Sequence, residues 1–244
     1  MPELTVLVTG GSSASGVAAA RALGAAGHRV FTIGSRQDRI EAAALEAGHG
    51  ATPLVCDLAR LDSVRQLATT LSGLGADHVD GVIHLVGGWR SATGIEDQSD
   101  DDWDALETGA ITTLRNVSRV FYGQLAASPR GRLAMVSSTT AAAPTAAAAS
   151  YAAAKAAAEA WTLAVADGFR RDQAGSRGTD HPLEQHSAAV VFVVKSLVDA
   201  SMRQAHPERK FPGYTDVEEL AAAVARLFDQ PAATLNGQRI LLAK

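Results

Sequence analysis

Tyr151 and Lys155 lie four residues apart in an alanine-rich segment of the chain. On a helix, this spacing brings two side chains to the same face, about one turn apart. A free phenol has a pKa near 10 and exchanges protons poorly at neutral pH, whereas a nearby ammonium favours the phenolate and lowers that pKa. The pair can therefore give a proton to a carbonyl oxygen as a hydride arrives, or remove one in the reverse direction.

A serine completes the candidate catalytic set. Ser138 follows the strand-like run 133–137 and stands thirteen residues before Tyr151. Open parallel sheets place their sites at the carboxyl ends of their strands. We expect the Ser138 hydroxyl to hydrogen-bond a substrate oxygen and to orient it. Ser137 is the less favoured alternative, because the two serines are adjacent.

A glycine-rich turn lies between the first expected strand and the first expected helix. Glycines let the backbone turn tightly and approach a phosphate, and a helix N-terminus offers unpaired N–H groups to the anion. The turn predicts a dinucleotide cradle, with a plain turn as the alternative. Its expected cofactor-binding residues are Gly10, Ser12, Ser13, Ala14, Ser15 and Gly16.

The second expected strand ends in Gly34-Ser35-Arg36, without the acidic residue that binds adenosine ribose hydroxyls in dinucleotide folds. Ser35 and Arg36 would suit a 2′-phosphate, which favours NADP(H) over NAD(H) as the cofactor. The alternative is that Arg36 faces water beside Asp38. Asp57 could hydrogen-bond the adenine edge or simply begin a turn. The remaining expected cofactor contacts, at the ends of the third and fourth strands, are Leu58, Val86 and Gly87.

Short apolar runs alternate with longer helical patterns along the whole chain. Most of the runs are continuously apolar, as parallel strands covered on both faces require. The expected strands are 4–9, 29–33, 53–56, 79–86, 133–137, 188–194 and 240–242. The expected helices are 15–26, 39–47, 61–71, 101–126, 151–169 and 217–228. The alternation predicts one domain, residues 1–244, with a Rossmann-type doubly wound parallel sheet of about seven strands and helices on both faces.

Composition narrows the class of protein. A net charge of −4 without a basic stripe argues against a nucleic-acid partner. No apolar stretch reaches the roughly 18 residues of a membrane span. Residues 1–4 lead straight into a strand, so we expect no signal peptide and a cytoplasmic protein. Cys56 is the only cysteine and reads as a core residue. The polar segment 170–186 predicts a mobile loop. We expect its His181 and His186 to be solvated rather than to bind a metal, and we expect no metal site.

The glycine turn, Asp57, Ser138 and the Tyr151-x-x-x-Lys155 motif have the order and spacing of the short-chain dehydrogenase/reductase family, which the chain resembles over nearly its whole length. The resemblance implies a Rossmann fold, NAD(P)(H) and a Ser–Tyr–Lys mechanism in which Lys155 also binds the nicotinamide ribose. It also implies a homodimer or homotetramer built on the two long helices.

Four departures from the family pattern mark a divergent member. Ala14 replaces the usual second glycine of the turn. His84-Leu85-Val86-Gly87 replaces Asn-Asn-Ala-Gly after the fourth strand. Ala110 aligns with the asparagine that often completes a proton relay, and Asn116 is not expected to substitute for it. Lys195-Ser196 replaces Pro-Gly after the sixth strand.

The leading hypothesis is an NAD(P)H-dependent oxidoreductase that acts on a small carbonyl or alcohol. The Gly87-Gly88-Trp89 loop and the segment from Val194 to Arg203 weakly resemble dihydropteridine reductases, so reduction of a flat nitrogen-containing ring is one alternative. Trp89 would then lie near the ring; otherwise it is a packing residue. Lys195 could contact an acidic group of the substrate or remain solvated. The second alternative is a non-catalytic NAD(P)-binding sensor or partner protein.

Overall fold

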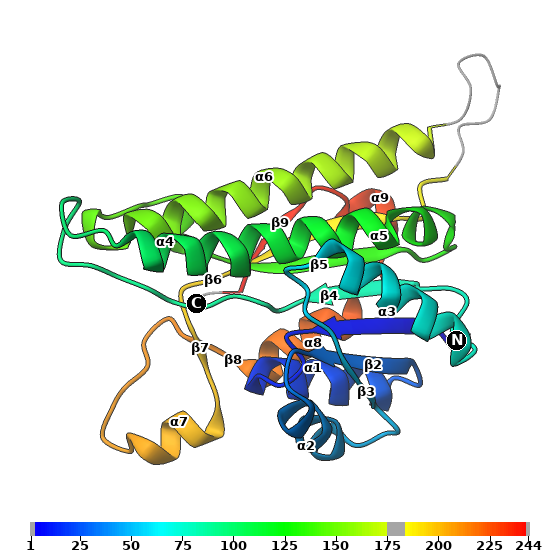
Figure 1. Ribbon diagram of the computed structural model, residues 1–244, viewed down its shortest axis with the longest axis horizontal. Helices are drawn as coiled ribbons and strands as arrows, with labels where there is room; N and C mark the ends of the chain where they lie inside the picture. The colour runs from blue at the N-terminus through cyan, green and yellow to red at the C-terminus, as the bar shows by residue number, and fades with distance from the viewer. Residues whose placement is uncertain (1–2, 175–183, 243–244) are drawn as a thin grey trace.

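A seven-stranded parallel sheet forms the centre of the molecule (Figure 1). The computed structural model describes residues 3–174 and 184–242. The strand order is β3-β2-β1-β4-β5-β6-β9. The strands are β1 (Thr5–Thr9), β2 (Arg29–Gly34), β3 (Thr52–Val55), β4 (Gly81–His84), β5 (Arg132–Ser138), β6 (Ala188–Val194) and β9 (Arg239–Leu241). The doubly wound Rossmann-type sheet expected from the sequence is thus confirmed, although β4 is shorter than the apolar run that contains it.

Helices cover both faces of the sheet, which is why its strands are continuously apolar. All seven residues of β6 are buried. One apolar core lies under α1 (Ala14–Ala25), α2 (Gln37–Ala47), α8 (Val217–Arg226) and α9 (Ala232–Leu235). The other lies under α3 (Leu61–Gly73), α5 (Thr113–Ala127) and α6 (Ala149–Asp172). Within the described ranges, no helix is long and apolar enough to span a membrane.

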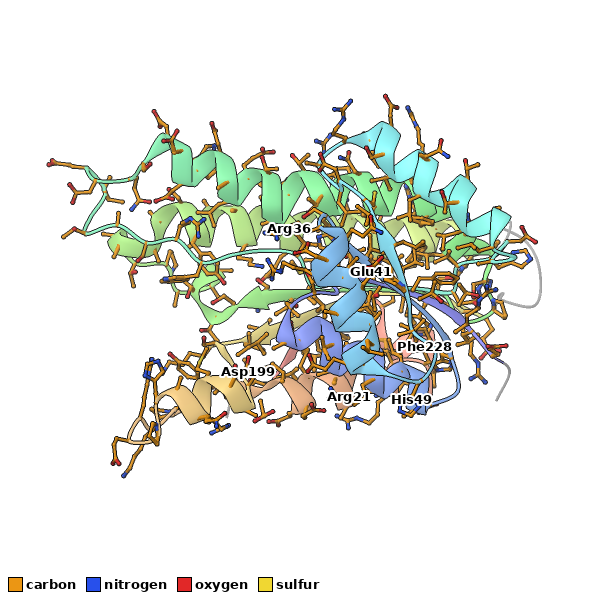
Figure 2. All side chains as sticks on the ribbon, turned by 60° about the horizontal axis from the view of Figure 1, so that its bottom comes forward. Arg21, Arg36, Glu41, His49, Asp199 and Phe228 are labelled. Carbon is orange, nitrogen blue, oxygen red and sulfur yellow. The ribbon has the colours of Figure 1, made fainter. Side chains whose placement is uncertain are left out.

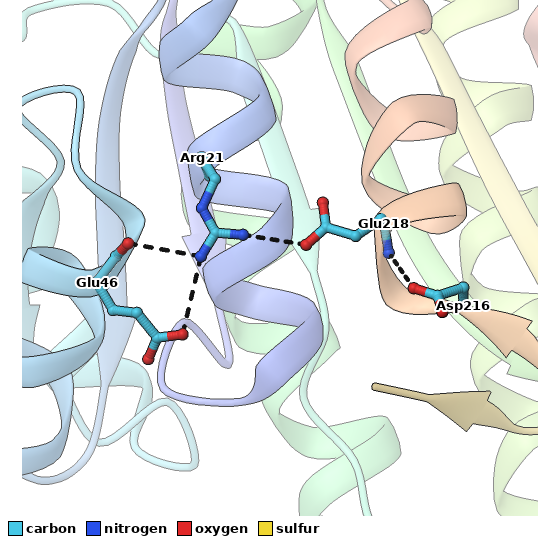
Figure 3. Close-up of polar contacts among 4 residues, drawn as sticks. All are labelled: Arg21, Glu46, Asp216 and Glu218. Carbon is cyan, nitrogen blue, oxygen red and sulfur yellow. Dashed lines mark hydrogen bonds and ion pairs between the residues drawn. The ribbon is translucent and has the colours of Figure 1, made fainter. Parts of the chain in front are cut away.

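A cluster of charged side chains links α1, α2 and α8 on one face of the sheet. Arg21 of α1 forms an ion pair with Glu218 of α8, with 3.0 Å between nitrogen and oxygen, and a longer one with Glu46 of α2 (Figure 3). Asp216 accepts a hydrogen bond from the backbone N–H of Glu218 and so caps α8. The Arg21 side chain is 37% exposed, so each pair contributes little to folding free energy and mainly orients the three helices.

The expected single helix over 101–126 is interrupted. The segment consists of α4 (Asp100–Glu107), a π-helical turn at Thr108–Thr112 and α5. At this turn the Thr113 hydroxyl donates to the Gly109 carbonyl. Apolar spacing cannot reveal one wide turn within a continuous helix, and the prediction of a regular helix was wrong there.

A small lobe projects from the body beyond β6 (Figure 1). The two-stranded sheet of β7 (Leu197–Val198) and β8 (Thr215–Asp216) brackets α7 (Ala200–Ala205). The sequence analysis did not predict these elements.

The segment before β6 differs from its expectation where it is described. Residues 175–183, including His181, lie outside the described residues. His186, which was expected to be solvated, is only partly exposed, and its Nδ1 lies 2.7 Å from the Ser128 carbonyl oxygen and 3.1 Å from the Gln173 amide nitrogen. These contacts hold it against the residues that end α5 and α6.

Arg132 begins β5 at the end of the sheet opposite Ser138. Its side chain is buried and donates at 2.8 Å to the carbonyls of His186, Leu227 and Gln230. Burial lowers the pKa of its guanidinium to about 10. The three bonds hold the segment before β6 and the segment after α8 against the start of β5.

Candidate active site

The structure brings the proposed catalytic residues together at the carboxyl end of β5. Tyr151 lies in the first turn of α6, Lys155 lies one turn further along, and Ser138 ends β5. Lys155 is 7% exposed, and its Nζ donates to the Val136 carbonyl at 2.9 Å. The same Nζ lies 6.0 Å from the centroid of the Tyr151 ring. The i, i+4 spacing therefore places both groups on one helix face, as expected.

Burial dominates the protonation of both groups. It lowers the pKa of Lys155 to about 8, because a buried ammonium loses its hydration. It raises the pKa of Tyr151, and a hydrogen bond with Ser138 opposes that rise. The sequence analysis predicted a lowered pKa for Tyr151; in this structure the loss of hydration outweighs the Ser138 hydrogen bond and raises it. At neutral pH the phenol is protonated and can act as a proton donor.

The two adjacent serines point to different faces of β5. The Ser138 hydroxyl donates to the Thr140 hydroxyl at 3.0 Å and accepts from the Thr140 backbone N–H. Ser137 is 1% exposed, and its hydroxyl has no hydrogen-bond partner among the described residues. Ser138 is thus the serine beside Tyr151, and the Ser137 hydroxyl is buried.

A cavity of about 340 Å³ connects the glycine-rich turn with Tyr151 and Lys155. Its walls come from the turn, the ends of β4, β5 and β6, the start of α6 and β7. They include Ser13, Ser15, Leu85, Val86, Gly87, Gly88, Trp89, Ser137, Tyr151, Lys155, Lys195 and Ser196. The expected cofactor-binding residues Val86, Gly87, Tyr151 and Lys155 therefore line one cleft.

Close packing explains the glycines of the turn. Gly10 has φ +76°, and a Cβ at this position would lie 2.6 Å from the Leu85 carbonyl oxygen. A Cβ on Gly16 would lie 2.5 Å from the Gly10 carbonyl oxygen. The Ser13 hydroxyl donates to that same oxygen and accepts from the Gly16 N–H, which caps α1. Ala14 is exposed and starts the helix, so its methyl group leaves the turn intact.

This cleft fits a dinucleotide because of its glycine-rich edge. The turn brings bare backbone and a helix N-terminus to that edge, as a pyrophosphate requires. Side chains at Gly10 or Gly16 would close this approach, since a Cβ there would lie 2.6 Å or less from a backbone oxygen.

Arg36 is exposed at the start of α2 (Figure 2). Ser35, which precedes it, is also exposed. The Arg36 guanidinium already pairs with Asp38, with 2.7 Å between nitrogen and oxygen, as the alternative reading anticipated. Arg39, which the sequence analysis missed, lines a cavity of about 670 Å³ with Ser12 and Ala14. Its side chain makes no hydrogen bond or ion pair to any described residue. Its place in the first turn of a helix, beyond the strand tip, carried no sequence signal.

The segment after β3 behaves as a turn. One Asp57 carboxylate oxygen accepts from the backbone N–H of Ala59, which is the alternative considered for this residue. Leu58 is buried, and the Asn116 amide donates to the carbonyls of Leu58 and Ala59. Asn116 therefore braces this turn and does not replace the missing asparagine at Ala110.

His84 ties three elements together beneath the site. Its Nδ1 lies 2.8 Å from the Thr9 hydroxyl of β1, and its Nε2 lies 3.1 Å from the Thr113 hydroxyl of α5. Burial lowers the pKa of His84 to about 3, and the charge of Lys155 adds to the effect. The imidazole is therefore neutral and structural.

Trp89 and Lys195 flank the mouth of the cleft. The Trp89 ring packs edge-on against Tyr151, with 4.6 Å between ring centroids, yet it is 55% exposed. It is therefore both a packing residue and part of the cleft wall. The Lys195 ammonium donates to the Pro212 carbonyl at 3.1 Å, which ties it to the lobe beyond β7.

The family model of short chain dehydrogenases matches residues 4–173. The chain belongs to this family, and it is an NAD(P)-dependent oxidoreductase. The comparison with curated protein sequences gives no match. The comparisons give no support to the dihydropteridine-reductase-like or non-catalytic alternatives.

Solved structures share the fold over nearly the whole chain. One is described as a short chain dehydrogenase/reductase family protein, with 24% identity and a TM-score of 0.79, covering 98% of this chain and 95% of that one. A metagenomic short-chain oxidoreductase in complex with NADP has 21% identity and a TM-score of 0.77, with 99% and 98% covered. An NAD⁺-bound xylitol dehydrogenase has 18% identity and a TM-score of 0.80, with 98% and 97% covered.

Proposed function

We propose that Tyr151, Ser138 and Lys155 catalyse the reduction of a carbonyl group on a small molecule, with NADPH as the favoured cofactor. The observation that carries the proposal is the single cleft that runs from the glycine-rich turn to the buried Tyr151–Lys155 pair. When bound, the cofactor supplies the hydride. The residues that would hold it are those of the turn, Gly87 and Lys155.

The protein's part is to handle one proton. The Tyr151 phenol, kept protonated by burial, donates its proton to the carbonyl oxygen of the substrate. The Ser138 hydroxyl hydrogen-bonds the same oxygen and orients it. The Lys155 ammonium favours the phenolate that remains, and the Val136 carbonyl holds that ammonium in place. In the oxidative direction the phenolate takes the proton back.

The proposed mechanism is tested by Tyr151→Phe, which removes one oxygen atom and keeps the ring against Trp89. We expect turnover of ketones by NADPH to be lost while the dissociation constant of NADPH, measured by fluorescence, stays within about twofold. Trp103→Phe, on exposed α4, serves as the matched aromatic control. Undiminished turnover in Tyr151→Phe refutes the assignment.

The NADPH preference is supported by the absence of an acidic residue at the tip of β2 and by two arginines near it. Arg36 is held by Asp38, whereas Arg39 is unengaged among the described residues and faces the cavity that includes Ser12. Parallel titrations with NADH and NADPH test the preference. Arg36→Ala and Arg39→Ala should each weaken NADPH more than NADH, and equal weak binding of both cofactors by the native protein refutes it.

We also propose a cytoplasmic homodimer or homotetramer. The long helices α5 and α6 present the partly buried rings of Tyr122 and Trp161, which line an open groove on the outer face. Light scattering of the native protein tests the assembly, and a monomer at micromolar concentration excludes it.

A further inference from the structure

Gln98 lies in the loop between β4 and α4, directly before Ser99, which caps α4. This loop also carries Trp89. Gln98 is only partly exposed, and its amide reaches the segment between β5 and α6, about 50 residues further along the chain. It therefore connects two loops on either side of the cleft.

The Gln98 amide uses its full hydrogen-bonding capacity. Its Nε2 donates to the Gly94 carbonyl at 2.9 Å and to the Ala146 carbonyl at 3.0 Å. Its Oε1 accepts from the backbone N–H of Ser150 at 3.1 Å and from the Ser150 hydroxyl at 2.6 Å. An amide group offers two donors and two acceptor sites, and all four are satisfied here. The backbone partners also determine which end is oxygen and which is nitrogen.

The catalytic helix lacks a cap of its own. Its N-cap residue is Ala148, which has no side chain that could accept from the first-turn N–H groups. Gln98 supplies this acceptor from a distant loop. A backbone bond from Ala92 to Ala147 at 2.8 Å reinforces the same junction. The start of α6 is thus held by the β4–α4 loop.

Tyr151 is the residue after Ser150, and Trp89 of the capping loop packs on its ring. We propose that Gln98 is a positioning residue that holds Tyr151 and the Trp89 loop in register across the cleft. The inference rests on the proposed function, because it assigns Tyr151 the reacting proton. Its Oε1 contacts hold the helix start and hence the phenol; its Nε2 contacts hold the loop and hence the cleft wall.

The two halves of the amide can be tested separately. Gln98→Glu keeps both acceptors for Ser150 and places a negative charge at a helix N-terminus, which is favourable. It loses the two donors to Gly94 and Ala146. Gln98→Ala loses all four bonds. Gln66→Ala, on the exposed face of α3, is the matched control.

We expect Gln98→Ala to lower kcat about tenfold and raise KM for the carbonyl substrate, because a misplaced acid loses most of its advantage. Gln98→Glu should raise KM severalfold and leave kcat within about twofold. The dissociation constant of NADPH should stay unchanged in both. A common fall in kcat for both variants, or unchanged kinetics in Gln98→Ala, overturns the proposal.

Amide hydrogen exchange gives a readout that does not depend on turnover. In the native protein the peptide 146–155 should be protected, and Gln98→Ala should speed its exchange at least tenfold, whereas Gln98→Glu should not. Unchanged exchange in Gln98→Ala refutes the capping role. If exchange is faster in Gln98→Ala but the native protein reduces no carbonyl, the capping contact is supported and only the proposed function is refuted.

Discussion

Lys155 combines catalytic value with a folding cost that can be measured. Its ammonium is buried and has one hydrogen-bond acceptor among the described residues, the Val136 carbonyl. The fall of its pKa from 10.5 to about 8 corresponds to about 3 kcal/mol of folding free energy at neutral pH, since one pKa unit is worth about 1.4 kcal/mol. The protein therefore carries a destabilising charge at its site.

Lys155→Met keeps the length of the side chain and removes the charge. It also leaves the Val136 carbonyl without its donor, which costs about 1–2 kcal/mol. We expect the variant to be inactive and yet more stable than the native protein at pH 7 by about 1–2 kcal/mol. For a chain of this size, each kcal/mol raises Tm by about 2–4 °C.

The pH dependence identifies the cause. The folded pKa lies below the unfolded one, so the folded state releases this proton first, and native stability rises between about pH 8 and 10.5. Lys155→Met should lack this rise. Urea unfolding of both proteins at pH 7 and pH 9.5 measures it, with exposed Lys210→Met as the control. A Lys155→Met protein less stable than native at pH 7, with an unchanged alkaline rise, refutes the reasoning.

Three further predictions follow from the site and its supports. The kcat/KM for carbonyl reduction should fall above about pH 8, where Lys155 loses its charge. A fall that begins only above pH 10 would assign this pH dependence to the Tyr151 phenol instead. Gly16→Ala should cost about 1–3 kcal/mol of stability and weaken cofactor binding, because its methyl group meets the Gly10 carbonyl, whereas Gly73→Ala in open space should not; equal stability of both variants contradicts this. His84 has a folded pKa of about 3, below the unfolded 6.5, so it should lower native stability by about 1.4 kcal/mol for each pH unit below 6.5. His84→Asn should remove that slope in acid unfolding and exposed His206→Asn should not, and a slope that persists in His84→Asn excludes the assignment.

The sequence predicted the central sheet well because its signal is local and strong. Strands such as Ala188–Val194 are continuously apolar, and a buried parallel strand has to be. The two-residue strands β7 and β8 have no such pattern, because each is too short to show any alternation. The wide turn at Thr108–Thr112 was missed because it shifts the apolar spacing by a single residue.

The candidate site was likewise predicted only where its sequence signal is local. Tyr151 and Lys155 are found from spacing, because a helix converts a four-residue interval into a shared face. The direction of the Tyr151 pKa was not found, since it depends on burial by residues far away in the chain. Gln98 gave no signal either, because two of its partners, Ala146 and Ser150, are about 50 residues distant.

The three carbonyls bound by Arg132 have a consequence for how this chain could diversify. They belong to residues 186, 227 and 230, all beyond residue 173, where the match to the family model ends. Arg132 and Ser138 stand at opposite ends of β5, about 20 Å apart. The C-terminal segment is thus anchored at the end of the sheet remote from the active site, while its lobe of β7, α7 and β8 projects beside the cleft. Lobes of other lengths could be grafted there without loosening that anchor, which makes this segment the natural place to retarget the enzyme.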